Sequence, residues 1–108
     1  MLFRSGKMAK STINVVRTKD AGVFFGKIVS KEHTLAGIVV KIENARRVYY
    51  WEGAATLSEL AQYGVAKPNA CKFPCPVDLI ECVAIEILDV TEEAEASLNA
   101  VPEWKART

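Results

Sequence analysis

The amino-acid sequence predicts a mainly β domain with two short helices, and three features lead to that prediction. Runs rich in β-branched and aromatic residues follow one another through the first half of the chain, separated by short turns. Helical signals are confined to two short segments. Strands and helices do not alternate, which excludes a doubly wound parallel sheet. We therefore predict a β-rich α+β domain, built as a small, strongly bent antiparallel sheet or an SH3-like barrel with two short helices.

The first two predicted strands form a hairpin. Residues 12–17 and 23–29 are rich in β-branched and aromatic side chains, which favour pleated, half-buried surfaces. Residues 18–22 between them contain Asp and Gly, which favour turns. Gly26 inside the second run indicates a bulge or the close approach of another backbone.

Two more strands are predicted after a loop. Residues 30–37 are mostly polar, and we expect them to form that loop. Residues 38–42 are β-branched and form the third strand, and residues 43–45 make a bend or bulge. Residues 46–51 combine two arginines with three aromatic rings and are expected to form the fourth strand.

The first helix has clear end signals. Thr56 and Glu59 fit a capping box, in which each side chain satisfies a free backbone amide of the first turn. Leu57 and Leu60 have helical spacing. Gly64 stands where a residue of positive φ would close the helix.

The last third of the chain is predicted to hold a long strand and a second helix. Residues 67–76 contain three prolines and are expected to form a loop. Residues 77–90 are apolar and β-branched, as one long strand or two short ones. Thr91 then caps a helix that Pro102 ends. Residues 1–11 and 103–108 are expected to be tails of a single domain over residues 12–102, although Trp104 could pin the second tail.

Charge divides the chain into two halves. Residues 1–50 carry ten Lys or Arg against three Asp or Glu, whereas residues 51–108 carry four against ten. Such a division suits a basic face for an anionic partner, or complementary faces on two subunits. It also suits a fold in which the two halves interleave and mix their charges. Apolar stretches are too short to cross a membrane, and with no secretory signal we expect a reducing cytoplasm.

Catalytic and metal-binding signatures are weak. Cys71, Cys75 and Cys82 provide three thiols, but a structural zinc site needs four ligands and His33 lies far away in sequence. His33 is expected to be an exposed loop residue. Neither a nucleophile elbow nor a phosphate-binding glycine loop occurs. We therefore expect no enzyme activity, no catalytic residue, no metal and no cofactor.

The most informative segment contains the two arginines and the aromatic rings. Arginine binds phosphate in a bidentate manner and aromatic rings stack on bases, so Arg46, Arg47, Tyr49 and Trp51 form a candidate ligand-binding surface. Arg17 would join it if the first hairpin packs nearby. A second interpretation is that the rings are core and the arginines are solvated or paired with Glu. A third is a protein interface, where Tyr, Trp and Arg supply most of the binding energy.

Several segments resemble a family of small uncharacterised proteins encoded by tailed bacteriophages and prophages. They are VRT at 16–18, GVFFG at 22–26, NARRVYYWEGAA at 44–55, LSELA at 57–61, KPN at 67–69, CKF at 71–73, IEI at 85–87 and TEEA at 91–94. The resemblance implies a phage gene product that acts in the host bacterial cytoplasm or is assembled into the particle. It implies no catalytic or ligand-binding residue.

These observations together predict a small phage-encoded accessory protein that works as a non-catalytic, self-associating binding module. Its partner would be a host component, such as a host protein, or a nucleotide-like anionic ligand. One alternative is a phage structural or assembly protein that uses the same aromatics as subunit contacts. Another is a small barrel that binds nucleic acid. No membrane partner is expected.

Overall fold

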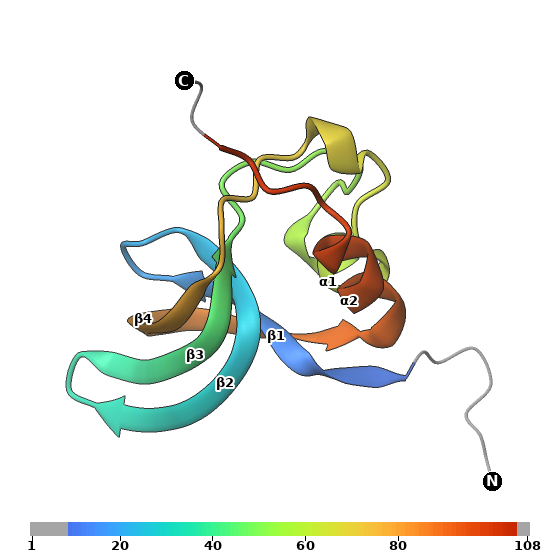
Figure 1. The fold of residues 1–108 in the computed structure, drawn as a ribbon. Coiled ribbons are helices and arrows are strands. Elements are labelled where there is room, and N and C mark those ends of the chain that lie inside the picture. Colours follow the sequence, from blue (N-terminus) through green and yellow to red (C-terminus); the bar gives the residue numbers. More distant parts are fainter. Residues whose placement is uncertain (1–8, 106–108) are drawn as a thin grey trace, which may run out of the picture.

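The computed structural model describes residues 9–105, and its centre is a closed barrel of antiparallel strands (Figure 1). Each strand pairs with the next, and the last returns to the first. The predicted fold class, a small β barrel with two short helices, is confirmed. The strands are β1 (Lys10–Thr18), β2 (Val23–Thr34), β3 (Gly37–Arg47) and β4 (Val77–Thr91).

Two short helices form a layer at one end of the barrel (Figure 1). They are α1 (Leu57–Tyr63) and α2 (Glu92–Asn99), and a 3-10 turn, η1 (Pro68–Ala70), follows α1. The two helices meet at Gly64, where an added Cβ would lie 2.3 Å from the Ser97 Cβ. The Ser97 hydroxyl accepts a hydrogen bond from the Val65 amide (3.0 Å) and donates one to the Val65 carbonyl (3.2 Å).

Both predicted helix starts are confirmed. The Thr56 hydroxyl accepts from the Glu59 amide (3.1 Å), and the Thr91 hydroxyl accepts from the Ala94 amide (3.0 Å). The Glu59 carboxylate reaches back to the amide of Ala55 rather than to that of Thr56. Gly64 closes α1 at a φ of +81°, as its position predicted.

Side-chain alternation along the barrel strands separates two hydrophobic cores. Val16 and Phe24, paired across β1 and β2, point into the barrel, whereas their neighbours Val15 and Phe25 point toward the helices. The barrel core consists of Val16, Phe24, Val40, Ile42, Ala45 and Ala84. The second core, between the barrel and the helices, consists of Val15, Phe25, Val48, Leu60, Ala61, Val65, Cys71, Phe73, Val90, Ala94, Leu98 and Val101.

The prediction of a loop over residues 30–37 is wrong. β2 continues to Thr34 and β3 starts at Gly37, so only a two-residue turn at Leu35 and Ala36 joins them. Gly37 adopts a φ of +127°, which a tight turn requires and glycine accepts. The segment is polar because its strand residues are exposed, and its pairing with residues 37–41 holds it as a strand.

The prediction of a separate fourth strand over residues 46–51 is also wrong. Residues 37–47 form one strand, bulged at Asn44, which has a φ of +52°. Gly26 lies opposite this bulge, and a Cβ there would approach the Glu43 carbonyl oxygen to 2.9 Å, so the predicted close backbone approach is confirmed. After Arg47 the chain leaves the barrel, and Tyr50 makes an isolated bridge with Lys72.

The remaining boundaries differ little from the expectations. The apolar segment before the second helix is one long strand, β4. β1 begins at Lys10, inside the stretch expected to be a tail, and residues 1–8 lie outside the described part of the chain. Near the other end, Glu103 forms a parallel bridge with Phe73, and the Trp104 amide donates to the Phe73 carbonyl (2.9 Å).

Candidate functional site

Arg46 is a structural residue rather than part of an open surface. Only 8% of it is exposed, and its guanidinium donates to the carbonyl oxygens of Pro74 (3.0 Å) and Phe73 (3.1 Å). It also lies over the Phe73 ring, 5.4 Å from the centroid. Burial lowers the pKa of Arg46, and the nearby charges of Glu103 and Cys75 partly oppose that effect. The Arg46 guanidinium therefore ties β3 to the segment before β4.

Arg47 points the opposite way and is exposed. Its guanidinium covers the ring of Phe24 at 4.4 Å from the centroid and donates a hydrogen bond to the Ala21 carbonyl in the first turn. The contacts of Arg47 are therefore with the β1–β2 turn, not with the aromatic residues that follow it in sequence.

Trp51 and Arg17 also have neighbours of their own. Trp51 is half-buried against the second core, and its indole N–H donates to the Ala54 carbonyl (3.2 Å). Arg17 lies on β1, where its Nε is 2.9 Å from a carboxylate oxygen of Glu86 on β4. Arg17, Arg46, Arg47, Tyr49 and Trp51 thus have five different sets of contacts. The structure does not bring them into one surface.

Tyr49 belongs to a different cluster, which we call the aromatic surface: Tyr49, Tyr50, Lys72 and Trp104. The rings of Tyr49 and Trp104 are stacked, with centroids 5.3 Å apart and planes only 6° from parallel. The ammonium of Lys72 lies 5.5 Å from the Trp104 centroid and 5.8 Å from that of Tyr50. All four residues are exposed, although large aromatic rings are usually at least partly buried.

Backbone pairing holds the aromatic surface in place. The amides of Tyr49 and Tyr50 both donate to the Lys72 carbonyl (3.2 Å each), and the Lys72 amide donates to the Tyr50 carbonyl (2.7 Å). The amide of Trp104 bonds the carbonyl of Phe73, which is fully buried. Three segments far apart in sequence therefore meet on the outside of the second core.

The pKa of Tyr50 is raised by its surroundings. Its hydroxyl donates to the Glu52 carboxylate, and that hydrogen bond raises the pKa of Tyr50 because ionisation would place two anions together. The phenol of Tyr50 is therefore held in its neutral form.

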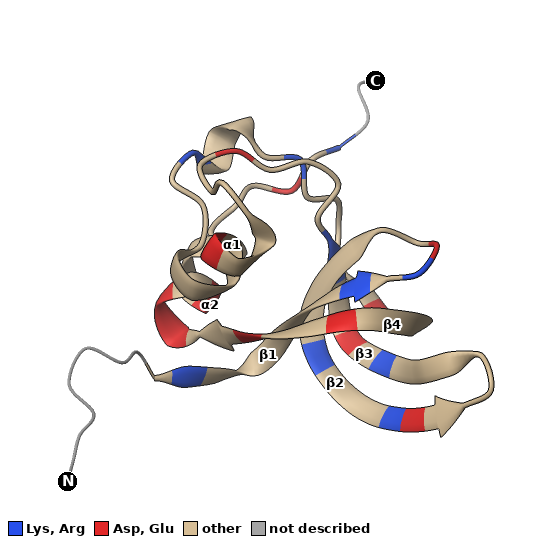
Figure 2. Cartoon of the chain, turned by 180° about the vertical axis from the view of Figure 1, so that it is seen from behind, with Lys and Arg blue, Asp and Glu red and all other residues tan. Residues whose placement is uncertain are grey.

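The charge asymmetry of the sequence is largely mixed by the barrel. β4 is acidic and lies between the more basic β1 and β3 (Figure 2). The Lys10 ammonium nitrogen is 3.4 Å from a carboxylate oxygen of Asp89, and Arg17 forms an ion pair with Glu86. Lys41 lies opposite Glu81 in the β3–β4 register. The start of α2 stays acidic (Figure 2), where three glutamates face the positive end of the helix.

The cysteines and the histidine are spread over the structure. Cys71 is buried and donates to the Lys67 carbonyl (3.4 Å), Cys75 is exposed, and Cys82 is half-buried on β4. His33 is exposed as predicted, but it lies in β2 rather than in a loop. Across residues 9–105, no three His, Cys, Asp or Glu side chains are grouped to hold a metal ion. Over the same range, no helix is long and apolar enough to cross a membrane.

Sequence reasoning found Tyr49 but missed Tyr50, Lys72 and Trp104 as its partners. The only available signals were the exposed aromatic character of Trp104 and the basic residue between Cys71 and Phe73. Neither indicates that the two segments lie against residues 49 and 50.

Comparison with known proteins gives one match. Residues 11–98 match the family described as "Domain of unknown function (DUF6948)", from the second residue of β1 to the next-to-last residue of α2. The match includes three residues of the aromatic surface, and Trp104 lies beyond it. No curated protein and no solved structure matches the chain.

Proposed function

The chain belongs to the DUF6948 family of domains, and we propose that it is a non-catalytic binding module that takes a planar, anionic, nucleotide-like ligand on its aromatic surface. The resemblance to phage and prophage proteins supports, as part of the same proposal, a phage-encoded accessory protein in the host bacterial cytoplasm.

One observation carries the proposal: an exposed aromatic stack stands beside an unpaired ammonium group. Trp104 is 44% exposed and Tyr49 63% exposed, so much of the stacked pair is accessible to a ligand. Within residues 9–105, the salt bridges are Lys10–Asp89 and Arg17–Glu86, so Lys72 is free to meet a phosphate. Stacking platforms beside a cation are how proteins hold single bases and short single strands.

Isothermal titration of the full chain with ATP at low salt tests the proposal. Because base stacking on an aromatic side chain contributes about 1–3 kcal/mol, Trp104→Leu should weaken binding by roughly tenfold. Lys72→Gln should weaken it by a smaller factor and make the affinity less sensitive to salt, because one phosphate contact is lost.

Tyr63→Leu is the matched control, since Tyr63 is a 56% exposed aromatic residue on α1, outside the aromatic surface. It should leave the affinity unchanged. No binding of ATP up to millimolar concentration would exclude the nucleotide. If Trp104→Leu binds ATP as tightly as the wild type does, the nucleotide binds outside the aromatic surface. Binding of hexathymidylate but not ATP, with affinity falling steeply in salt, would favour the nucleic-acid-binding alternative.

A second candidate function is a subunit contact, as in a homo-oligomeric assembly protein. It is favoured by the same exposure: three adjoining rings, 63%, 42% and 44% exposed, are a surface that association would bury. In that case native mass should show an oligomer that Trp104→Ala reduces to smaller species. A wild-type monomer at the highest soluble concentration would exclude this candidate.

A further inference from the structure

A groove runs along the seam between the barrel and α2, apart from the aromatic surface. It consists of two cavities of about 350 Å³ and 460 Å³. Phe25, Asn44 and Asn99 line both cavities, so the two adjoin. Phe25 contributes an apolar wall and is itself anchored in the second core. The groove therefore has a rigid wall, with one asparagine from the barrel and one from the helix on its sides.

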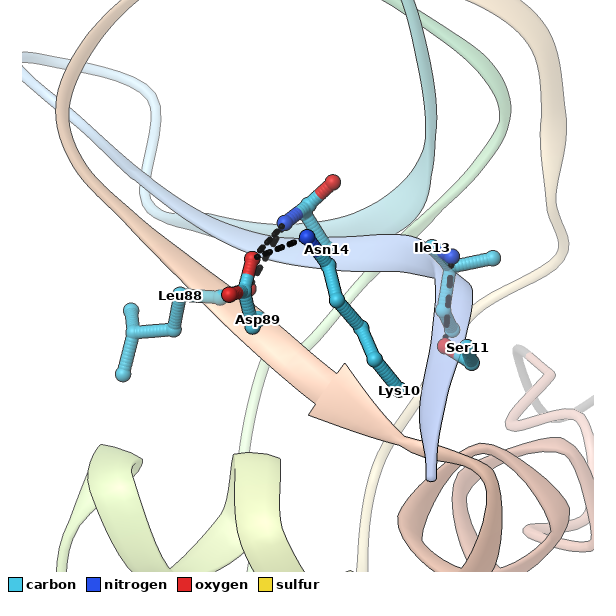
Figure 3. A network of polar contacts seen from close by, with 6 residues as sticks. All are labelled: Lys10, Ser11, Ile13, Asn14, Leu88 and Asp89. Atoms are coloured by element: carbon cyan, nitrogen blue, oxygen red, sulfur yellow. Dashed lines mark hydrogen bonds and ion pairs between the residues drawn. The ribbon is translucent and has the colours of Figure 1, made fainter. Parts of the chain in front are cut away.

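The first cavity lies where β1 and β2 part. Their pairing ends at Asn14 and Gly26, although β2 continues to Thr34. β1 instead stays with β4: the side-chain amide of Asn14 donates to the Leu88 carbonyl (3.1 Å) and to the Asp89 carboxylate (3.2 Å), as Figure 3 shows. Within residues 9–105, the edge of β2 that faced β1 has no strand partner beyond Gly26.

On the β1 side of this fork, the backbone is already partly satisfied. The Ile13 amide bonds the Ser11 hydroxyl of its own strand (3.2 Å) (Figure 3). Thr12 and Ile13 still line the cavity, opposite Gly26 and Lys27 of β2. An added strand would therefore pair with the free edge of β2, and the side chains of β1 would form the other wall.

The two asparagines offer what a peptide backbone needs. Each side-chain amide is both donor and acceptor, and neither makes a hydrogen bond to another residue within 9–105. Asn44 is also the one non-glycine residue of that range with positive φ, at +52°. This bulge turns Asn44 into both cavities rather than into the ladder.

The charges select the kind of peptide. In the first cavity the carboxylates of Glu43 and Glu95 face a single cation, Lys27, and none of the three is in a salt bridge within residues 9–105. In the second cavity Arg46 and Glu103 offset each other, and the Arg46 guanidinium is bound to two carbonyls. The last turn of α2 has no basic residue, so its negative end also favours a cation. The first cavity therefore has one more negative charge than positive charge. This excess favours a cationic side chain over an anionic ligand.

We propose that this groove binds an extended peptide of a partner protein, which adds a strand to the free edge of β2 and places one basic side chain between Glu43 and Glu95. This site is independent of the nucleotide-like ligand proposed above.

Titration of the isotope-labelled full chain with a defined peptide tests the proposal by amide NMR. The probe is a heptapeptide of alternating threonine and valine with a central arginine, and its counterpart has a central glutamate. The arginine peptide should shift the amides of residues 27–30 and 44, and the glutamate peptide should not. Asn44→Gly keeps the positive φ but removes the side-chain amide, so it should fold normally and bind about fivefold more weakly. Glu95→Gln should weaken binding by a similar factor.

Matched controls lie outside the groove. Asn69→Ala removes an exposed amide in η1, and Glu92→Gln neutralises a carboxylate at the start of α2. Both should bind as the wild type does. The proposal is overturned if the arginine peptide causes no shifts at millimolar concentration, or if Asn44→Gly and Glu95→Gln bind it unchanged. Shifts confined to Tyr49 and Trp104 would also overturn it, without affecting the proposed aromatic surface.

Discussion

The two hydrophobic cores differ in where their residues come from. Every residue of the barrel core belongs to a strand, and antiparallel pairing joins those strands to one another. The second core also collects Val48 and Phe73 from the long connection and Val101 from the segment after α2. The aromatic surface lies on the outer side of this second core. The barrel is thus a scaffold, and the recognition surface depends on the core that is assembled from distant segments.

Loss of a large aromatic ring from each core tests this division most strongly. Phe24→Ala and Phe73→Ala each remove a fully buried ring and should destabilise the fold by about 3–5 kcal/mol. Urea unfolding measures both. At temperatures where both variants remain folded, only Phe73→Ala should disturb the Tyr49–Trp104 stack, seen as a change in near-ultraviolet circular dichroism. An equal spectral change in Phe24→Ala would contradict the division.

The helix–helix contact of the second core should tolerate no added atom. Gly64→Ala places a Cβ 2.3 Å from Ser97 at a φ of +81°, and overpacking with positive φ should cost about 3 kcal/mol. The double variant Gly64→Ala with Ser97→Gly removes the clash but not the backbone strain. Part of the lost stability should therefore return, and full additivity of the two changes would disprove the contact.

Adjacent arginines should differ in their effect on stability. Arg46→Met removes the donor to the Pro74 carbonyl and one of the two donors to the Phe73 carbonyl, and should cost about 2 kcal/mol. Arg47→Met removes an exposed guanidinium and should cost less than about 1 kcal/mol. Thermal or urea unfolding of the pair measures the difference, and equal losses would show that Arg46 is not the internal tie described above.

The smallest expected effect concerns the ionisation of Tyr50. Its hydrogen bond to the Glu52 carboxylate raises the pKa of the phenol, so in Glu52→Gln that pKa should fall back toward its ordinary value. Absorbance titration at alkaline pH detects the change, and subtraction of the Tyr50→Phe curve assigns it. If the Tyr50 pKa is the same in Glu52→Gln as in the wild type, the Glu52 carboxylate is not the cause of the shift.

The sequence predicts the barrel better than the aromatic surface. The barrel depends on local sequence signals, whereas the aromatic surface depends on contacts between segments that are far apart in sequence. Alternation, turn residues and capping residues are local signals, so they predict the hairpin, the close backbone approach at Gly26 and both helix starts. They also predict β structure before the second helix, but not whether it is one strand or two. Residues 30–37 were misassigned because a strand exposed along its length resembles a loop in composition. Alternation along a strand puts Arg46 and Arg47 on opposite faces, but it cannot show that Phe73 covers the face of Arg46. The pairing of Tyr49 with Trp104 spans half the chain and leaves no local signal.

The two tryptophans provide the most direct test of the binding surface. Each gives its own indole N–H signal: Trp104 lies on the aromatic surface, and Trp51 bonds Ala54 against the second core. When the labelled wild-type protein is titrated with ATP, the signal that Trp104→Leu removes should move and saturate, while the Trp51 signal stays in place. A Trp104 signal that does not move, or movement of Trp51 alone, would contradict recognition at the aromatic surface.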